Sequence, residues 1–183
     1  PKTQAAYQAT QDYVALMADA RAVARTAGYD TASYDLDLIA FAATFSGGWA
    51  GRGYVGGKGI WLNGYFDLRV VGHELGHNLG AWHANFWQAT GLTVVGPGSS
   101  EEYGNPFDMM GSSGGAQSHF NAWVKWFFGW IPSAEVAVLA ADGTGTYRVQ
   151  GLEAAVDGGL HALRIPRDAQ RDYWVDFRTA LGN

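Results

Sequence analysis

The chain contains no cysteine, few charged residues and no long apolar segment. Without cysteine it has neither disulfides nor thiolate ligands, so a zinc site would have to use His, Asp or Glu side chains. Only 16% of its 183 residues are charged, the twelve Lys and Arg are scattered, and the formal net charge is −5. A nucleic-acid or anionic-membrane partner would favour a basic patch, so the sequence argues against both. No bland apolar stretch approaches the roughly 18 residues of a membrane span.

Apolar residues and glycine are, in contrast, abundant. Hydrophobic residues make up 48% of the chain, aromatic residues 14%, and there are 26 glycines. This composition predicts a sizeable core with tight turns around aromatic side chains. The length suits one domain, or one catalytic unit with a small β-rich appendage. Residues 1–4 lack the basic-then-apolar order of a signal peptide, so if the protein is exported its leader lies outside this chain.

The first third of the chain changes from helical to strand periodicity. Apolar residues recur at helical spacing over 4–27, and Gly28 supplies a stop, so we expect one helix there. Residues 34–41 alternate and then become fully apolar, which predicts a strand entering a sheet. In the glycine-rich stretch 47–64 we expect two short strands, one of them at a sheet edge.

The middle of the chain is expected to hold a second helix. Asp67 is placed to cap a helix that runs through Leu79. Its buried side is expected to carry Val70, Val71, Leu75 and Leu79. Residues 84–116 are predicted to be mostly loop, and Ser118 is a candidate cap for a third helix through about Phe128.

Beyond Pro132 the pattern changes to short strands separated by glycine turns. The expected strands are 135–140, 145–149, 159–165 and 172–178, forming an antiparallel meander. We therefore divide the chain into a catalytic domain over 1–131 and a β-rich segment over 132–183.

Residues 73–83, with the sequence HELGHNLGAWH, carry the strongest functional pattern. Positions i and i+4 share one face of a helix, so His73 and His77 can direct ring nitrogens at one metal ion. Gly80 permits the sharp exit that would bring His83 to the same ion. Three protein ligands leave a position for water, as in catalytic zinc sites. Glu74 is then placed to take the proton of that water as a general base.

The alternative is a solvated helix that carries two histidines by chance. The extended pattern specifies three His, one Glu and one Gly, and its chance per start position is on the order of one in 10⁷. The sequence therefore favours a site for one catalytic Zn²⁺.

HExxHxxGxxH is the signature of the metzincin clan of metallopeptidases, which this chain resembles. The resemblance implies a methionine-containing turn that packs under the imidazoles. Met110, directly before Gly111, is the first candidate for this turn and Met109 the second. The region 102–111, together with 120–123 and 173–178, resembles the gametolysin family and its bacterial relatives.

The resemblance implies an α+β, zincin-like catalytic domain. Such a domain has a twisted, mostly parallel sheet, an antiparallel edge strand and the active-site helix. Extended peptide substrates would add to the edge strand by backbone hydrogen bonds. Residues 51–57 are the candidate edge, because their glycines would let a substrate backbone approach; a flexible loop is the alternative. The strand that usually precedes the first helix has no counterpart before residue 4, so a processed or truncated form is expected.

Several other polar residues leave alternatives open. Asp108 could orient a ligand imidazole or cap its own turn. His119 could help stabilise an oxyanion near the cleft or serve as an ordinary capping residue. Tyr103 lies seven residues before Met110, and we do not assign it as a ligand. Residues 101–102 and 35–37 contain paired acids, but without the ordered spacing of a calcium loop.

The leading hypothesis is a secreted, bacterial zinc endopeptidase that cleaves extracellular proteins bound in an extended cleft. One rival is a binding module on a decayed peptidase fold, against which the intact Glu74 and ligand set argue. A second rival keeps the zinc but hydrolyses a non-peptide amide or ester.

Overall fold

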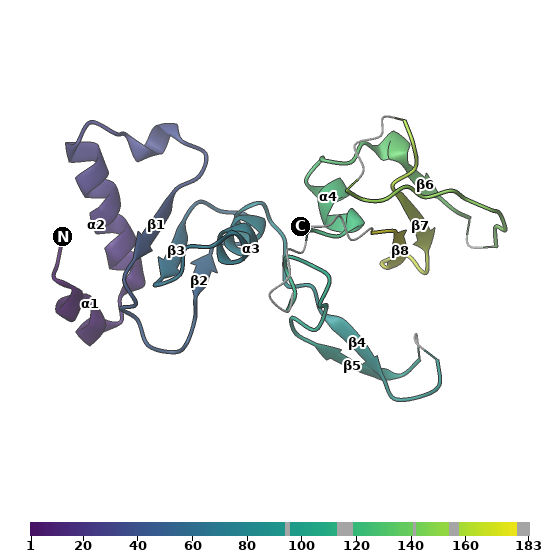
Figure 1. The fold of residues 1–183 in the computed structure, drawn as a ribbon, viewed down its shortest axis with the longest axis horizontal. Coiled ribbons are helices and arrows are strands. Elements are labelled where there is room, and N and C mark those ends of the chain that lie inside the picture. Colours follow the sequence, from purple (N-terminus) through teal and green to yellow (C-terminus); the bar gives the residue numbers. More distant parts are fainter. Residues whose placement is uncertain (94–95, 113–118, 141, 154–157, 179–183) are drawn as a thin grey trace. The chain divides into compact units, whose positions relative to one another are not determined.

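The computed structural model describes residues 1–93, 96–112, 119–140, 142–153 and 158–178. Over these residues the chain is α+β, with four α-helices and three small sheets (Figure 1). It forms two compact units, Pro1–Ser118 and His119–Asn183. The division falls earlier than the 131/132 boundary expected from the sequence, because the helix at 122–127 packs with the C-terminal strands. No described helix is both long and apolar enough to cross a membrane.

The first unit begins with two helices instead of the single helix expected over 4–27. Helix α1 spans Gln4–Thr10 and helix α2 spans Tyr13–Thr26. Gln11 has the left-handed φ of 52° and ends α1, and the Asp12 side chain accepts from the Ala15 N–H to cap α2. The spacing of apolar residues continues across this break, which is why periodicity alone misses it.

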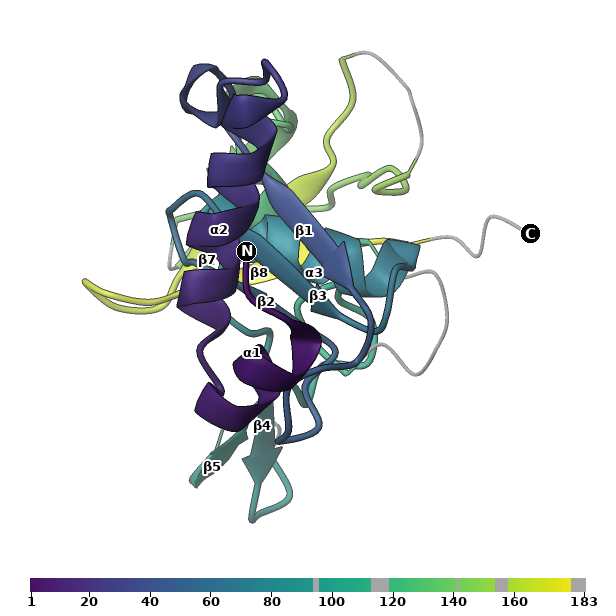
Figure 2. The same ribbon diagram turned by 90° about the vertical axis from the view of Figure 1, so that its left-hand side faces the viewer.

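A three-stranded sheet follows, in the order β1-β3-β2. Strand β1 (Leu38–Phe41) pairs parallel with β3 (Ile60–Asn63), and β2 (Gly51–Gly53) pairs antiparallel with β3 at the edge. The two short strands expected in the glycine-rich stretch are confirmed, whereas the strand expected from residue 34 begins only at Leu38. Helix α2 lies on one face of this sheet and helix α3 (Leu68–Asn78) on the other (Figures 1 and 2).

Helix α3 has the expected bounds but a different buried face. The Asp67 carboxylate accepts from the Val70 N–H at 2.9 Å, as a cap should. The buried residues are Glu74, Gly76, His77 and Asn78, whereas Val70, Val71 and Leu75 are partly exposed and Leu79 is exposed. The expected aliphatic face is therefore wrong. The polar face is tolerated in part because the Asn78 amide donates to the carbonyls of Tyr54 and Gly59.

Residues 84–112 contain a hairpin where mostly loop was expected. Strand β4 (Phe86–Ala89) pairs antiparallel with β5 (Gly98–Glu101), so that Phe86 lies opposite Glu101. Both strands are largely exposed, so no alternation of buried and exposed residues marks them in the sequence.

The second unit consists of helix α4 (Ala122–Phe127) and a three-stranded sheet. Its strands are β6 (Val136–Val138), β7 (Ala162–Pro166) and β8 (Asp172–Asp176). Strands β6 and β7 are parallel, so the expected antiparallel meander holds only for β7 and β8, and 145–149 forms just an isolated bridge at Val149. Asn121, not Ser118, caps α4 through the Val124 N–H; Ser118 lies outside the described residues.

Candidate metal centre

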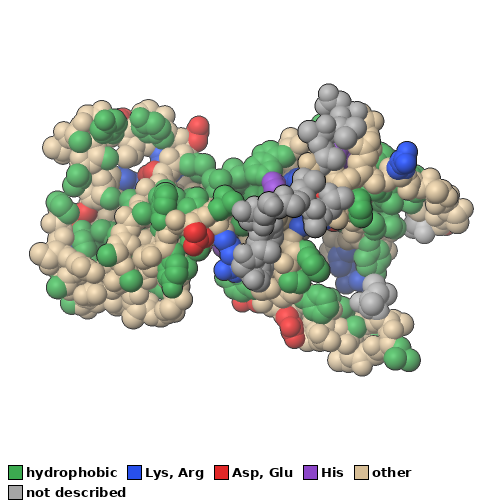
Figure 3. All heavy atoms as spheres, in the orientation of Figure 1, with side chains coloured by type: hydrophobic (Ala, Val, Ile, Leu, Met, Phe, Trp, Pro, Cys, Tyr) green, Lys and Arg blue, Asp and Glu red, His purple; other side chains and the backbone are tan. Residues whose placement is uncertain are grey.

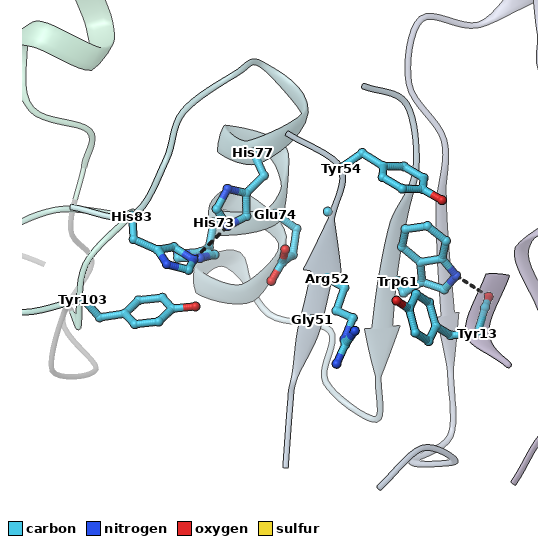
Figure 4. Close-up of a pocket in the computed structure, with 11 residues that line it drawn as sticks. Tyr13, Gly51, Arg52, Tyr54, Trp61, His73, Glu74, His77, His83 and Tyr103 are labelled. Carbon is cyan, nitrogen blue, oxygen red and sulfur yellow. Dashed lines mark hydrogen bonds between the residues drawn. The ribbon is translucent and has the colours of Figure 1, made fainter. Parts of the chain in front are cut away.

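Three imidazoles converge in the first unit, between helix α3 and the segment that follows it (Figure 4). His73 and His77 lie one turn apart on α3. The chain turns away from the helix at Gly80, whose φ is 102°, and folds back so that His83 lies beside the other two imidazoles. The Nε2 atoms of His77 and His83 are 3.1 Å apart, and the candidate ligand atoms of all three residues lie within 4.8 Å of one another. The three side chains are therefore close enough to bind one metal ion.

The two helical histidines are held by backbone carbonyls. His73 Nδ1 lies 2.9 Å from the Met109 carbonyl oxygen, and His77 Nδ1 lies 2.8 Å from that of Ala81. A carbonyl can only accept, so each Nδ1 carries the proton and each Nε2 keeps its lone pair. This arrangement fixes both the tautomer and the orientation of a ligand ring.

The third histidine is held differently, by a side chain. His83 Nδ1 donates to Glu102 Oε1 at 2.7 Å. The His83 side chain is 20% exposed, whereas that of Glu102 is 67% exposed. A carboxylate partner makes the hydrogen bond charge-assisted and increases the electron density at Nε2.

This donor set fits a divalent transition metal such as zinc. Two nitrogens at about 2.0–2.1 Å from a tetrahedral zinc lie roughly 3.3 Å apart, close to the 3.1 Å between His77 and His83. Burial lowers the pKa of His73 to about 4 and also lowers the pKa of His77, so both rings are neutral near pH 7, as ligands must be. Within the described ranges, no other group of His, Asp or Glu side chains is spaced to hold a metal ion.

Glu74 lies beside the imidazoles without joining the group that could hold a metal. Its side chain is buried, with 6% of the residue exposed. Desolvation raises its pKa to about 7, against the opposing effect of the positive charge of Arg52. A carboxyl group with this pKa can both accept and release a proton near neutral pH.

The candidate methionine turn is buried in the same unit. Met110 is fully buried and its carbonyl accepts from the Ala84 N–H, while Met109 supplies the carbonyl that holds His73. Asp108 is also fully buried, and it accepts from the Met110 N–H at 2.8 Å. Since all three ligand Nδ1–H groups have other acceptors, Asp108 caps its own turn and does not orient an imidazole.

His119 and the acidic pairs have other surroundings. His119 belongs to the second unit, where its Nδ1 accepts from the Phe120 N–H, so a role near the cleft stays a prediction. Asp37 forms an ion pair with Arg21 at 2.7 Å. The structure thus gives Asp37 and Glu102 partners other than calcium.

Two residues of the site were not identified from the sequence. Glu102 was considered only for calcium. The Tyr103 ring lies 3.7 Å from that of His83, centroid to centroid, and its hydroxyl points toward the side of the site that holds Glu74 (Figure 4). Tyr103 has a left-handed φ of 60°, which directs its side chain toward the imidazoles. No sequence pattern predicts this backbone conformation.

A groove runs past these residues along strand β2. One pocket of about 310 Å³ is lined by β2, the three imidazoles and Tyr103, and a second of about 190 Å³ continues past Trp49. Gly51, His73, Glu74 and Tyr103 line both. The candidate metal centre therefore lies where two adjoining pockets meet.

Two glycines of β2 face helix α3. A methyl group at Gly51 would lie 2.6 Å from Glu74 Oε1, and one at Gly53 would lie 2.6 Å from the Glu74 carbonyl oxygen. Both glycines thus allow α3 to pack directly against β2, which brings Glu74 to the strand. The expected edge strand is confirmed at 51–53, and a Cβ atom at its glycines would face the helix; the approach of a substrate backbone to this edge stays a prediction.

Comparisons of the chain with models of known protein families, with curated proteins and with solved structures found no match.

Proposed function

We propose that this chain is a zinc-dependent endopeptidase of the metzincin type, secreted by a bacterium and active on extracellular proteins. One observation carries the proposal: three imidazoles present convergent ring nitrogens beside a buried carboxyl group. The secreted location and the metzincin type are supported by the sequence resemblance alone.

The residues of the site have complementary chemical roles. Zinc, when bound by His73, His77 and His83, lowers the pKa of water toward about 7 and polarises a carbonyl group. Glu74 takes the proton of the attacking water and passes it to the leaving amine. Its pKa of about 7 suits transfer in both directions. The Tyr103 ring lies against that of His83 and lines the same pocket, so we expect its hydroxyl to donate a hydrogen bond to a substrate carbonyl.

The edge strand supports a peptide as the substrate. Within the described part of the chain, β2 pairs only with β3, so its other edge is unpaired. An extended peptide could add to that edge by backbone hydrogen bonds, within the groove that passes Glu74. A closed pocket would instead favour a small amide or ester.

The proposal is tested by digestion of a broad peptide library with zinc-loaded protein, with and without a chelator. We expect internal cleavage that the chelator abolishes and that added zinc restores. Glu74→Gln should retain one zinc per chain and lose about 10²- to 10⁴-fold in kcat, because only the proton transfer is removed.

The rival functions give different results. Hydrolysis of small esters or amides without peptide cleavage would favour the second rival, and stoichiometric zinc with no hydrolysis would favour a binding module. Near-wild-type turnover by Glu74→Gln would contradict the role given to Glu74.

A further inference from the structure

Arg52 places a positive charge beside the candidate metal centre. It lies in the middle of β2 and lines the same pocket as the imidazoles and Glu74. Its charge acts on the Glu74 carboxyl group, so the two side chains are within electrostatic range. Arg52 is exposed, whereas Gly51 and Gly53 on either side of it are partly buried against α3.

The guanidinium group is held in place by aromatic rings. Its Cζ lies 4.7 Å from the centroid of Tyr13 and 4.8 Å from that of Trp49. Figure 4 shows the side chain extending from β2 toward Tyr13. A guanidinium held on ring faces keeps its N–H edges available for a carboxylate.

Several other arginines of the described chain, unlike Arg52, lie beside a carboxylate. Arg21, Arg164, Arg171 and Arg178 each lie beside an Asp carboxylate. Among the described residues, no carboxylate forms a hydrogen bond or ion pair with Arg52. The guanidinium group held by Tyr13 and Trp49 is therefore available to a substrate carboxylate.

Strand geometry predicts which substrate side chain would lie near the Arg52 guanidinium group. Successive side chains of a strand alternate between faces, and directly opposed residues of paired strands share a face with Cβ atoms about 4.5–5.5 Å apart. The side chain of a peptide residue opposite Arg52 would therefore project from the same face of the sheet as the Arg52 side chain. The neighbouring peptide residues would project toward the side of Gly51 and Gly53, where Glu74 lies.

We propose that Arg52 is a specificity-determining residue that selects polypeptides with an Asp or Glu side chain within about two residues of the scissile bond. This inference rests on the proposed peptidase function and adds a substrate class to it. An acidic substrate side chain would pair with the guanidinium held by Tyr13 and Trp49. A basic side chain at that position would be disfavoured by like-charge repulsion.

The test compares zinc-loaded wild type with Arg52→Gln and Arg52→Glu on matched peptides that carry Glu, Gln or Lys near the cleaved bond. We expect wild type to prefer Glu over Gln in kcat/KM by about 5- to 10-fold at low salt. Arg52→Gln should remove that preference, measured as the ratio of kcat/KM for the Glu and Gln peptides within each variant, and Arg52→Glu should reverse it in favour of Lys.

Arg25→Gln is the matched control. Arg25 is exposed on α2 and lines neither pocket, and its substitution changes the net charge equally. It should leave the preference intact, and circular dichroism should show that every variant is folded. Peptide cleavage without an acidic preference, or a preference that survives Arg52→Gln, would overturn the inference and leave the peptidase function standing. Absence of any peptide cleavage by wild type would overturn both.

Discussion

The hydrogen bond between His83 and Glu102 allows the proposed zinc binding to be tested by a single substitution. His73 and His77 donate to the backbone carbonyls of Met109 and Ala81, which remain when the side chains of those two residues are substituted. His83 alone is held by a carboxylate, at 2.7 Å. Glu102→Gln preserves the length of the side chain but replaces a charged acceptor with a neutral one, so it weakens the orientation and basicity of a single ligand.

The expected effect can be bounded from the exposure of Glu102. Loss of such a partner costs about 10- to 100-fold in metal affinity. The Glu102 side chain is 67% exposed, so water screens part of its charge, and we expect the lower end of the range. A tenfold loss in zinc affinity corresponds to about 1.4 kcal/mol.

Competition with a chromogenic zinc chelator at constant pH and salt measures this loss. Glu101→Gln is the matched control, because Glu101 lies next in sequence but pairs with Phe86 in the hairpin. Its zinc affinity should stay within about twofold of wild type. Equal affinities for the two variants would refute the role assigned to Glu102.

Burial and close packing at the site affect metal affinity, the pH dependence of stability and the tolerance of substitutions. Because the pKa of His73 is about 4, this ring stays neutral above pH 5 and at most two protons can compete with zinc for the three ligands, so log Kd should change by no more than about two per pH unit between pH 6.5 and 5; a slope of three in a titration series would contradict this. The pKa of Glu74 is raised from 4.5 to about 7, so this residue favours the folded state below pH 4.5 and loses that contribution as the pH rises through 7. In metal-free protein, Glu74→Gln should therefore increase the free energy of unfolding by about 2–3 kcal/mol at pH 8 and by little at pH 4.5, as measured by urea denaturation. Gly53→Ala should destabilise the protein by about 1–3 kcal/mol, because its methyl group would meet the α3 backbone at 2.6 Å, whereas Gly91→Ala meets nothing within 4 Å and should be close to neutral in thermal unfolding.

The parts of the site that sequence analysis could predict depend on local geometry. His73 and His77 share a helix face because of their spacing, Asp67 caps that helix as expected, and Gly80 takes the positive φ that lets His83 return. These features need only a few consecutive residues. The edge strand also follows from a local pattern, whereas the α+β class is implied by the family resemblance.

The remaining features depend on contacts between distant segments. Glu102 reaches His83 across 19 residues through a hairpin whose exposed strands carry no periodic pattern. The buried face of α3 is polar because β2 presents glycines to it, and helical periodicity alone cannot reveal the partner surface. The break at Gln11 requires a left-handed residue that is not glycine, which composition does not indicate.

The carbonyls that hold His73 and His77 have a further consequence for the protein without metal. Both rings are oriented by main-chain groups of a structured turn and a helix end. We therefore expect zinc binding to need little ordering of the chain, unlike a zinc finger, whose folding depends on its ion. A chelated sample should then remain folded and regain metal rapidly.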